Sequence, residues 1–275
     1  AALHYAKLHV ENSPESKVLV IASDIAKYGV GTPGEPTQGA GSVAMLITQN
    51  PRIMAFNNDN VAQTRDIMDF WRPNYSSTPY VNGMYSTQQY LDCLTTTWDE
   101  YKKRYDWTMD DFAAICFHLP YPKLALKGLR KMMDKTLSKE KQNSLQENFD
   151  KSILYSQMIG NIYTGSLFLG LLSLLENAET LKAGDKIALY SYGSGAVSEF
   201  FSGELVEGYE AYLDKERLSK LKQRTALSVA DYEKVFFEEV QLDESGSAQF
   251  AGYEYQDYAL VEIVDHQRRY SKVEK

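Results

Sequence analysis

Short continuous apolar runs alternate along the chain with longer segments whose apolar residues recur at helical intervals. A continuous apolar run bounded by polar or turn residues is typical of a strand buried under helices. On this criterion we predict strands at 17–23, 42–47, 112–116, 186–192 and 196–201, and an alternating pattern predicts another at 258–264. We expect the first two strands to be buried on both faces.

Helical periodicity is clear at 86–105, where Tyr90, Leu94 and Trp98 fall on one face. Ser86 begins a sequence that resembles a capping box, so one interpretation of Ser86 is the N-cap of this helix. Further helices are predicted at 1–12, within the charged stretch 128–156, at 166–176 and within 217–239. Strands interleaved with helices in this way indicate an α/β protein.

His118 stands directly after the strand predicted at 112–116 and before a helix that carries Lys123 and Lys127. The carboxyl ends of strands are where α/β folds bind ligands, and a histidine there can change charge near neutral pH. The two lysines lie four residues apart, so they share a helix face and could meet an anion. A core histidine followed by ordinary helix lysines remains the alternative.

Two other segments offer hydrogen-bond donors for a carbonyl oxygen. Asn161 lies in a polar stretch just ahead of the apolar helix at 166–176, where backbone N–H groups are free. Gly193 and Gly195 flank Ser194, whose backbone amide could donate to an oxyanion. Helix capping near Asn161 and a tight hairpin turn at Ser194 remain the alternatives.

The loop at 29–41 is glycine-rich but matches no phosphate-loop or dinucleotide fingerprint. A loop of this length is more often functional than a plain connection, and Thr37 is its candidate polar side chain. Asp24 and Tyr28 lie just past the strand that precedes it. Asp69, beside aromatic residues and an arginine, indicates either a packed corner with a buried ion pair or the wall of a site.

The 275 residues carry a formal net charge of −8 with no block of like charge, which argues against a general nucleic-acid binder. No apolar run reaches the roughly 18 residues that would span a bilayer, so we expect no membrane segment. Cys93 and Cys116 show neither metal-ligand spacing nor a disulfide framework. We therefore expect a reducing, cytoplasmic setting and no bound metal.

The candidate side chains share one kind of chemistry. His118, Asn161 and the Ser194 amide can all donate to a carbonyl oxygen, and the lysines after His118 supply an adjacent anion site. Condensation or transfer of a thioester-bound acyl group on a phosphorylated carrier would use both. A nucleophile is missing, because Cys116 lies inside an apolar run, where a thiol keeps a high pKa and is inert.

The motifs that carry these residues resemble the hydroxymethylglutaryl-CoA synthase family in its bacterial form. The resemblance extends over nearly the whole chain in the family's order. It rests on Asp69-Phe70-Trp71-Arg72-Pro73, Phe117-His118-Leu119-Pro120-Tyr121-Pro122-Lys123, Gly160-Asn161-Ile162-Tyr163-Thr164-Gly165-Ser166, Tyr192-Gly193-Ser194-Gly195-Ala196 and Phe200-Phe201-Ser202-Gly203.

The resemblance implies a thiolase-like, five-layer αβαβα fold with two similar halves, each built on a mixed sheet. Residues 1–55 would then be the remainder of the N-terminal half and 56–275 the C-terminal half. It also implies a homodimer of the mevalonate (isoprenoid) pathway that needs no cofactor. Its substrates would be coenzyme A thioesters: acetyl-CoA acylates a cysteine, a glutamate removes a methyl proton, and the resulting enolate attacks acetoacetyl-CoA.

The resemblance also implies roles for particular residues. His118 would polarise the acetoacetyl carbonyl, Asn161 would bind the acyl group, and the Ser194 amide would form part of an oxyanion hole. The remaining implied positions are Lys123 and Lys127 on coenzyme A, with Tyr28, Thr37, Ser86, Asp24, Asp69 and Tyr163 as substrate-binding or supporting residues.

The family's cysteine and glutamate have no counterpart in this sequence, since neither Cys93 nor Cys116 matches the nucleophile's position. The chain also opens at Ala1 without an initiating Met. We expect it to be the C-terminal portion of a protein that carries both groups upstream. A non-catalytic acyl-CoA-binding chain of the same fold, and a synthase that adds branches to carrier-bound polyketides, remain alternatives.

Overall fold

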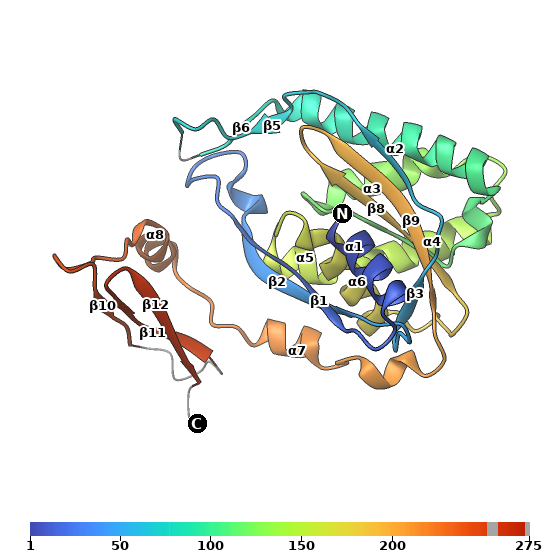
Figure 1. Cartoon of the computed structure of the whole chain (residues 1–275). Coiled ribbons are helices and arrows are strands. Elements are labelled where there is room, and N and C mark those ends of the chain that lie inside the picture. The colour runs from blue at the N-terminus through green and yellow to red at the C-terminus, as the bar shows by residue number, and fades with distance from the viewer. Residues whose placement is uncertain (77, 252–257, 273–275) are drawn as a thin grey trace. The chain divides into compact units, whose positions relative to one another are not determined.

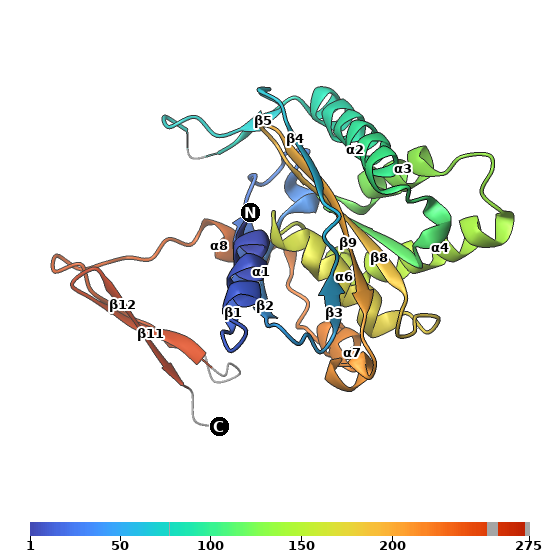
Figure 2. The same ribbon diagram turned by 45° about the vertical axis from the view of Figure 1, so that its right-hand side comes forward.

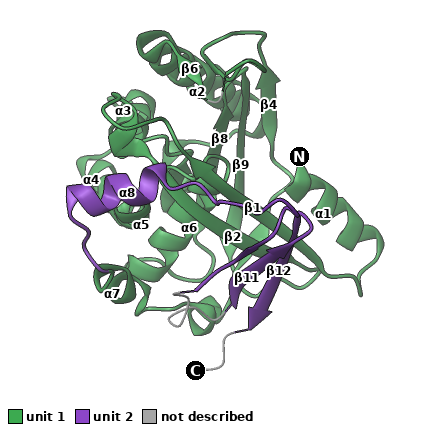
Figure 3. Ribbon diagram, turned by 90° about the vertical axis from the view of Figure 1, so that its left-hand side faces the viewer, with its two compact units in different colours: residues 1–224 green, residues 225–275 purple. Residues whose placement is uncertain are grey.

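The computed structural model describes residues 1–76, 78–251 and 258–272, which form two compact units (Figure 3). Residues 1–224 make up unit 1, which contains every predicted site residue, and residues 225–275 make up unit 2. The division at residue 55 into two similar halves stays a prediction.

Within its described residues, unit 1 contains three sheets, and the shortest of them pairs only β5 with β6. A second two-stranded sheet pairs β1 with β2 in antiparallel register along the full length of both strands. Its larger sheet has the order β3-β9-β8-β7, with β4 also paired to β9. The strands of unit 1 are β1 (Val18–Ala26), β2 (Gly39–Ile47), β3 (Met54–Phe56), β4 (Val61–Thr64), β5 (Phe70–Trp71), β6 (Tyr80–Val81), β7 (Ala114–Phe117), β8 (Lys186–Gly193) and β9 (Val197–Leu205).

The helices of unit 1 match the predicted periodicity. They are α1 (Ala2–Asn12), α2 (Gly83–Tyr105), α3 (Pro122–Met132), α4 (Lys139–Ser152), α5 (Leu154–Ile159), α6 (Gly165–Asn177) and α7 (Arg217–Lys222), with short 3₁₀ turns at Glu35–Thr37, Met109–Asp111 and Tyr209–Tyr212. Among the residues that the structure describes, no helix is long and apolar enough to cross a membrane.

Layers of helices and sheets alternate in unit 1 (Figures 1 and 2). Helix α6 contacts the β1–β2 sheet on one side and strands β7 and β8 on the other, and α1 lies beside it. Helix α2 packs on the opposite face of the larger sheet and contacts α3. Because β7 and β8 are parallel while β8 and β9 are antiparallel, the larger sheet is mixed, as predicted for this α/β fold.

The apolar core of unit 1 lies on both faces of the larger sheet. One cluster fills the space under α2 with aromatic residues such as Tyr90, Trp98 and Phe200. The other cluster lies between the sheet and α6 and includes Leu174 and Leu189. The continuous apolar strand β8 is therefore covered from two sides, which explains its sequence pattern.

The prediction that the strands at 17–23 and 42–47 are buried on both faces is wrong. On the first strand, Leu19 and Ile21 are 57% and 58% exposed, and they alternate with the partly buried Val18, Val20 and Ala22. On the second strand, exposed and partly buried residues alternate, and Leu46 is 48% exposed. The helices α1, α5 and α6 contact this two-stranded sheet. An apolar run therefore appears here on a strand with one exposed side.

Unit 2 is small and carries a helix and a meander of three strands. Helix α8 (Val229–Phe237) is capped by Ser228, whose hydroxyl accepts from the Asp231 backbone amide. Strands β10 (Ala248–Gln249), β11 (Tyr258–Val264) and β12 (Gln267–Lys272) pair in antiparallel order. The strand predicted at 258–264 is confirmed.

A buried carboxylate ties α6 to the segment that leads into α7. Glu176 accepts from Nε of Arg217 at 2.8 Å, from the Tyr155 hydroxyl at 2.6 Å and from the Asp214 amide at 3.0 Å. The Glu176 side chain is 1% exposed, whereas that of Arg217 is 41% exposed. Water therefore screens part of this attraction, but the carboxylate depends on its partners.

We predict that Arg217→Ala lowers the free energy of unfolding by about 2 kcal/mol, because it leaves a buried carboxylate without its cation. Arg104→Ala is the matched control, since Arg104 pairs with Glu100 on the exposed face of α2 and should cost less than about 1 kcal/mol. Urea unfolding followed by circular dichroism measures both. Equal losses in the two variants would contradict the structural role of Glu176.

Candidate functional site

His118 lies at the carboxyl end of β7, as predicted. Its backbone N–H donates to the Tyr190 carbonyl of β8 at 2.7 Å, and its own carbonyl accepts from the Tyr90 hydroxyl at 3.0 Å. Burial lowers the pKa of His118 to about 4. The imidazole is therefore neutral near pH 7, and it can donate or accept a hydrogen bond without carrying charge.

Asn161 is fixed by hydrogen bonds on both ends of its amide group. Its Oδ1 accepts from the Tyr163 backbone N–H and the Ser166 hydroxyl, both at 2.9 Å, and its Nδ2 donates to the Tyr28 hydroxyl at 3.0 Å. Its backbone N–H donates to the Thr37 carbonyl. The side chain thus does not cap α6, whose N-cap is Thr164.

Gly160 allows the Asn161 segment to lie against the loop at 29–41. A Cβ at Gly160 would stand 1.9 Å from the Gln38 carbonyl oxygen, and the residue has a φ of +87°. Both facts require glycine. The Thr37 hydroxyl donates to the Gly34 carbonyl within the short 3₁₀ turn, so Thr37 reaches Asn161 through its backbone.

Three aromatic rings gather around the Asn161 amide. The centroid of the Tyr28 ring lies 6.0 Å from that of Phe70 and 6.3 Å from that of Tyr163, with both pairs edge-to-face. Burial, followed by the influence of Tyr28 and Asp24, raises the pKa of Tyr163. The Tyr163 phenol therefore stays protonated near neutral pH and is a neutral donor.

A second set of hydrogen bonds is centred on the Asp69 carboxylate. It is fully buried, and its carboxylate accepts from the hydroxyls of Ser86 at 3.0 Å, Tyr192 at 3.0 Å and Ser194 at 2.8 Å. The Gly195 backbone N–H donates to the same carboxylate at 3.1 Å. These bonds draw the turn between β8 and β9 toward the start of α2.

For Asp69 and for Ser86, the structure contradicts one of the two interpretations that the sequence left open. Asp69 makes no ion pair among the described residues, because hydroxyls and an amide satisfy its oxygens, and Arg72 donates instead to the Ser76 carbonyl. Ser86 is not the N-cap of α2. Asn82 caps the helix by accepting from the Tyr85 amide, which leaves the Ser86 hydroxyl to bind Asp69.

A series of contacts joins His118 with the residues around Asn161 and with the residues around Asp69. The Tyr90 ring, whose hydroxyl holds His118, lies 5.3 Å from the ring of Tyr192. Tyr192 in turn binds Asp69, whose chain neighbour Phe70 packs against Tyr28. The segments carrying His118, Ser194 and Asn161, far apart in the sequence, are thus linked through a continuous set of side chains.

Lys123 and Lys127 lie outside this series. Both are exposed on α3, four residues apart and therefore on one face. The beginnings of α2 and α3 are adjacent, since the hydroxyls of Thr87 and Tyr121 lie 3.5 Å apart. The lysines are consequently placed at the surface near the Ser86 end of the site.

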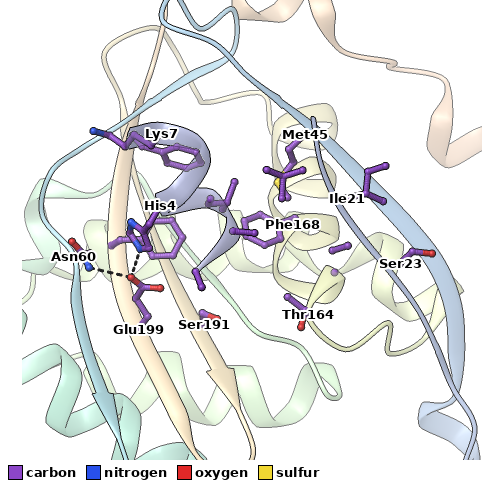
Figure 4. A pocket seen from close by; sticks show the side chains of 18 of the residues that line it. His4, Lys7, Ile21, Ser23, Met45, Asn60, Thr164, Phe168, Ser191 and Glu199 are labelled. Carbon is purple, nitrogen blue, oxygen red and sulfur yellow. Dashed lines mark hydrogen bonds and ion pairs between the residues drawn. The ribbon is translucent and has the colours of Figure 1, made fainter. Parts of the chain in front are cut away.

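Asp24 lies within β1 rather than past its end, and it is exposed. It is the one predicted site residue that lines a cavity of about 360 Å³ between α1, β1 and β9 (Figure 4). In Figure 4 the side chains of His4 and Glu199 point toward each other, and Asn60 reaches the same carboxylate at 3.2 Å. Asp24 therefore borders this cavity.

Neither cysteine is placed to act as a nucleophile. Cys93 and Cys116 are free and buried, and burial raises the pKa of the Cys116 thiol to about 12. A thiol in that state is inert. Across the described ranges, no three His, Cys, Asp or Glu side chains gather closely enough to hold a metal ion.

Sequence reasoning missed four residues that shape this site, namely Tyr90, Phe70, Ser166 and Tyr192. Each appeared in a helical face or a motif, but none was singled out as a site residue. Tyr192 offered one usable signal, since it places a hydroxyl next to the glycine that ends β8. The others act through contacts between distant segments, which no local pattern contains.

The chain matches known proteins along most of its length. The family model described as "Hydroxymethylglutaryl-coenzyme A synthase C terminal" matches residues 60–152 and 130–269. The hydroxymethylglutaryl-CoA synthase of Enterococcus faecalis is 51% identical over 245 residues, which cover 88% of this chain and 63% of that protein. A crystal structure of a hydroxymethylglutaryl-CoA synthase complexed with coenzyme A is 66% identical, with a TM-score of 0.95 over 99% of this chain and 70% of that one.

A second, less similar relative is named for polyketide biosynthesis. The polyketide biosynthesis 3-hydroxy-3-methylglutaryl-ACP synthase of Bacillus subtilis (strain 168) is 32% identical over 244 residues, 82% of this chain and 57% of that protein. The chain therefore spans about three fifths of the length of these two curated relatives.

We predict that acid destabilises the fold through His118. Its pKa is about 4 when folded against 6.5 for an unperturbed histidine, so the unfolded chain binds the proton first as pH falls below 6.5. Stability is then lost until the folded pKa is reached, and between pH 7 and pH 5 the loss is about 2 kcal/mol. His118→Gln should remove this share of the pH dependence in urea unfolding. A variant with the same pH dependence as the parent would contradict a neutral His118 imidazole in the folded protein.

Proposed function

Since the chain belongs to the hydroxymethylglutaryl-CoA synthase family, we propose that it carries the acceptor-binding part of an enzyme that condenses acetyl-CoA with acetoacetyl-CoA. The product would be hydroxymethylglutaryl-CoA, made in the mevalonate route to isoprenoids. The observation that carries this proposal is the neutral His118 at the end of β7, joined by contacts to Asn161 and the Ser194 turn. The 51% identity to the Enterococcus enzyme supports it.

His118 is proposed as the catalytic residue that acts on the acetoacetyl carbonyl. A neutral imidazole can donate its N–H to the ketone oxygen and stabilise the negative charge that develops when an enolate adds to the carbon. Its low pKa favours hydrogen bonding over full proton transfer at neutral pH. A cationic imidazole is not required for this step.

Asn161 and Ser194 are proposed to bind the thioester end of the substrate. One hydrogen of the Asn161 amide is given to Tyr28, which leaves the second for an acyl oxygen. The Ser194 backbone amide lies in a turn that Asp69 fixes through the Ser194 hydroxyl and the Gly195 amide. Such prearranged donors are the main source of oxyanion stabilisation in acyl transfer.

The remaining predicted residues are proposed to support or extend this pocket. Tyr28, Thr37 and Tyr163 shape its aromatic side, and Ser86 and Asp69 hold the turn. Lys123 and Lys127 are exposed cations that can meet the phosphates of coenzyme A. Asp24 approaches from β1 as a supporting carboxylate.

The acetyl-carrying cysteine and the proton-removing glutamate are proposed to lie upstream of Ala1. The reasons are that Cys93 and Cys116 are buried in the core and that the chain spans 63% of the Enterococcus relative. In the full reaction the cysteine thiolate displaces coenzyme A from acetyl-CoA, and the glutamate takes a methyl proton. The enolate adds to the ketone, and water then hydrolyses the enzyme thioester to release the product and the thiol.

Two other functions remain as competing proposals. A polyketide β-branching synthase would use a carrier protein as acceptor, and the 32% identity to the Bacillus protein against 51% to the Enterococcus one favours the coenzyme A substrate. A non-catalytic acyl-CoA-binding chain would keep the pocket without turnover. Homodimeric assembly and a cytoplasmic setting are part of the first proposal.

We predict that the natural protein forms hydroxymethylglutaryl-CoA from acetyl-CoA and acetoacetyl-CoA, detected by mass spectrometry. His118→Gln should lower kcat by at least about a hundredfold, because carbonyl polarisation is lost. Turnover only with an acceptor bound to a carrier protein would favour the polyketide alternative. Binding of acyl-CoA without any product would favour the non-catalytic one.

We predict a similar dependence on Asp69. Asp69→Asn replaces an acceptor oxygen by an NH₂ group that faces hydroxyl donors, so the Ser194 turn should shift and kcat should fall by about a hundredfold. Asp59→Asn is the control, because Asp59 is also a buried carboxylate bound by Tyr and Ser hydroxyls but lies away from the turn. Steady-state kinetics measure kcat for both variants. An equal loss of activity in the two would refute the role of Asp69 in holding the Ser194 turn.

A further inference from the structure

Tyr90, His118 and Tyr190 close a ring of hydrogen bonds. The His118 N–H donates to the Tyr190 carbonyl at 2.7 Å, the Tyr190 hydroxyl donates to the Tyr90 carbonyl at 3.0 Å, and the Tyr90 hydroxyl donates to the His118 carbonyl at 3.0 Å. The three residues come from α2, β7 and β8. The peptide groups on both sides of His118 are therefore held, although its imidazole is left for other partners.

The Tyr90 side chain, whose hydroxyl closes this cycle of hydrogen bonds, is buried among its neighbours. It is 1% exposed, and its ring packs edge-to-face on Tyr190 at 5.3 Å. Gly128 of α3 lies beside the Tyr90 ring, where a Cβ would stand in ordinary contact at 3.6 Å from Tyr90 Cε1 but only 2.9 Å from Leu94 Cδ2.

Tyr90 also contacts the other side of the candidate site. Its ring lies 5.3 Å from that of Tyr192, whose hydroxyl binds Asp69, and Asp69 holds Ser194. Burial raises the pKa of Tyr90 well above its ordinary value, so its hydroxyl remains a donor at all pH values near neutrality. One side chain therefore contacts the supports of both His118 and the Ser194 turn.

We propose that Tyr90 is a positioning residue that fixes the direction of the His118 imidazole and its spacing from the Ser194 turn. Only the kinetic consequence of this role rests on the proposed function, since the geometric role is independent of the reaction. The imidazole is carried on the His118 Cα through two side-chain torsions, so any displacement of the backbone displaces the ring with it. A shift of the His118 carbonyl by the loss of one bond would misplace the ring relative to a bound carbonyl.

Tyr90→Phe in the natural protein tests this proposal, because it removes the hydroxyl and keeps the ring that packs on Tyr192. Tyr101→Phe is the matched control: Tyr101 is also fully buried on α2, but its hydroxyl binds Asp59. The His118 ring resonance in a ¹H–¹³C spectrum, assigned with His118→Gln, should move in Tyr90→Phe and stay in Tyr101→Phe. For hydroxymethylglutaryl-CoA formation, Tyr90→Phe should lower kcat about tenfold and change KM less than about twofold.

The two readouts separate failure of this proposal from failure of the proposed function. If the parent protein makes no product, the proposed function fails, and the resonance alone decides the role of Tyr90. An unmoved His118 resonance in Tyr90→Phe overturns the positioning role. So does an active Tyr90→Phe variant whose kcat equals that of Tyr101→Phe, because both substitutions remove one buried hydroxyl from the same helix.

Discussion

The pairing of β8 with β7 on one side and β9 on the other decides where the candidate site lies. Because β7 and β8 run parallel, their carboxyl ends meet at one edge of the sheet, and His118 and the Ser194 turn emerge there. Covering helices bury β8 on both faces, which keeps this register fixed. The contacts from His118 to the Asp69 group pass through Tyr90 of α2 and Tyr192 of β8.

The site is built mainly from neutral donors. Tyr90, Tyr163 and Tyr192 remain protonated because burial raises the pKa of each, and His118 remains uncharged because burial lowers its pKa. In a dry environment such groups form strong, directed hydrogen bonds without the cost of burying charge. The oxygens of Asp69 are satisfied by the hydroxyl and amide donors around them. This composition suits the polarisation of a carbonyl group.

The sequence predicts helices and strands well where neighbouring residues determine them. It does not predict contacts or burial that depend on residues distant along the chain. The strand before His118 and the apolar helix after Asn161 follow from hydrophobic pattern alone. The role of Ser86 does not, because Asn82 competes for the cap and Asp69 lies distant in sequence. A local pattern also cannot tell which side of β1 is covered, since that depends on which other elements pack against it.

His118, Asn161 and the Ser194 turn are proposed to face one thioester. A crystal structure of the natural protein with bound acetoacetyl-CoA shows whether they do. We expect the ketone oxygen within hydrogen-bonding distance of the His118 ring, an acyl oxygen near the Asn161 amide, and the phosphates toward Lys123. An acyl group bound instead in the cavity beside His4 and Glu199, away from these three groups, would contradict the account.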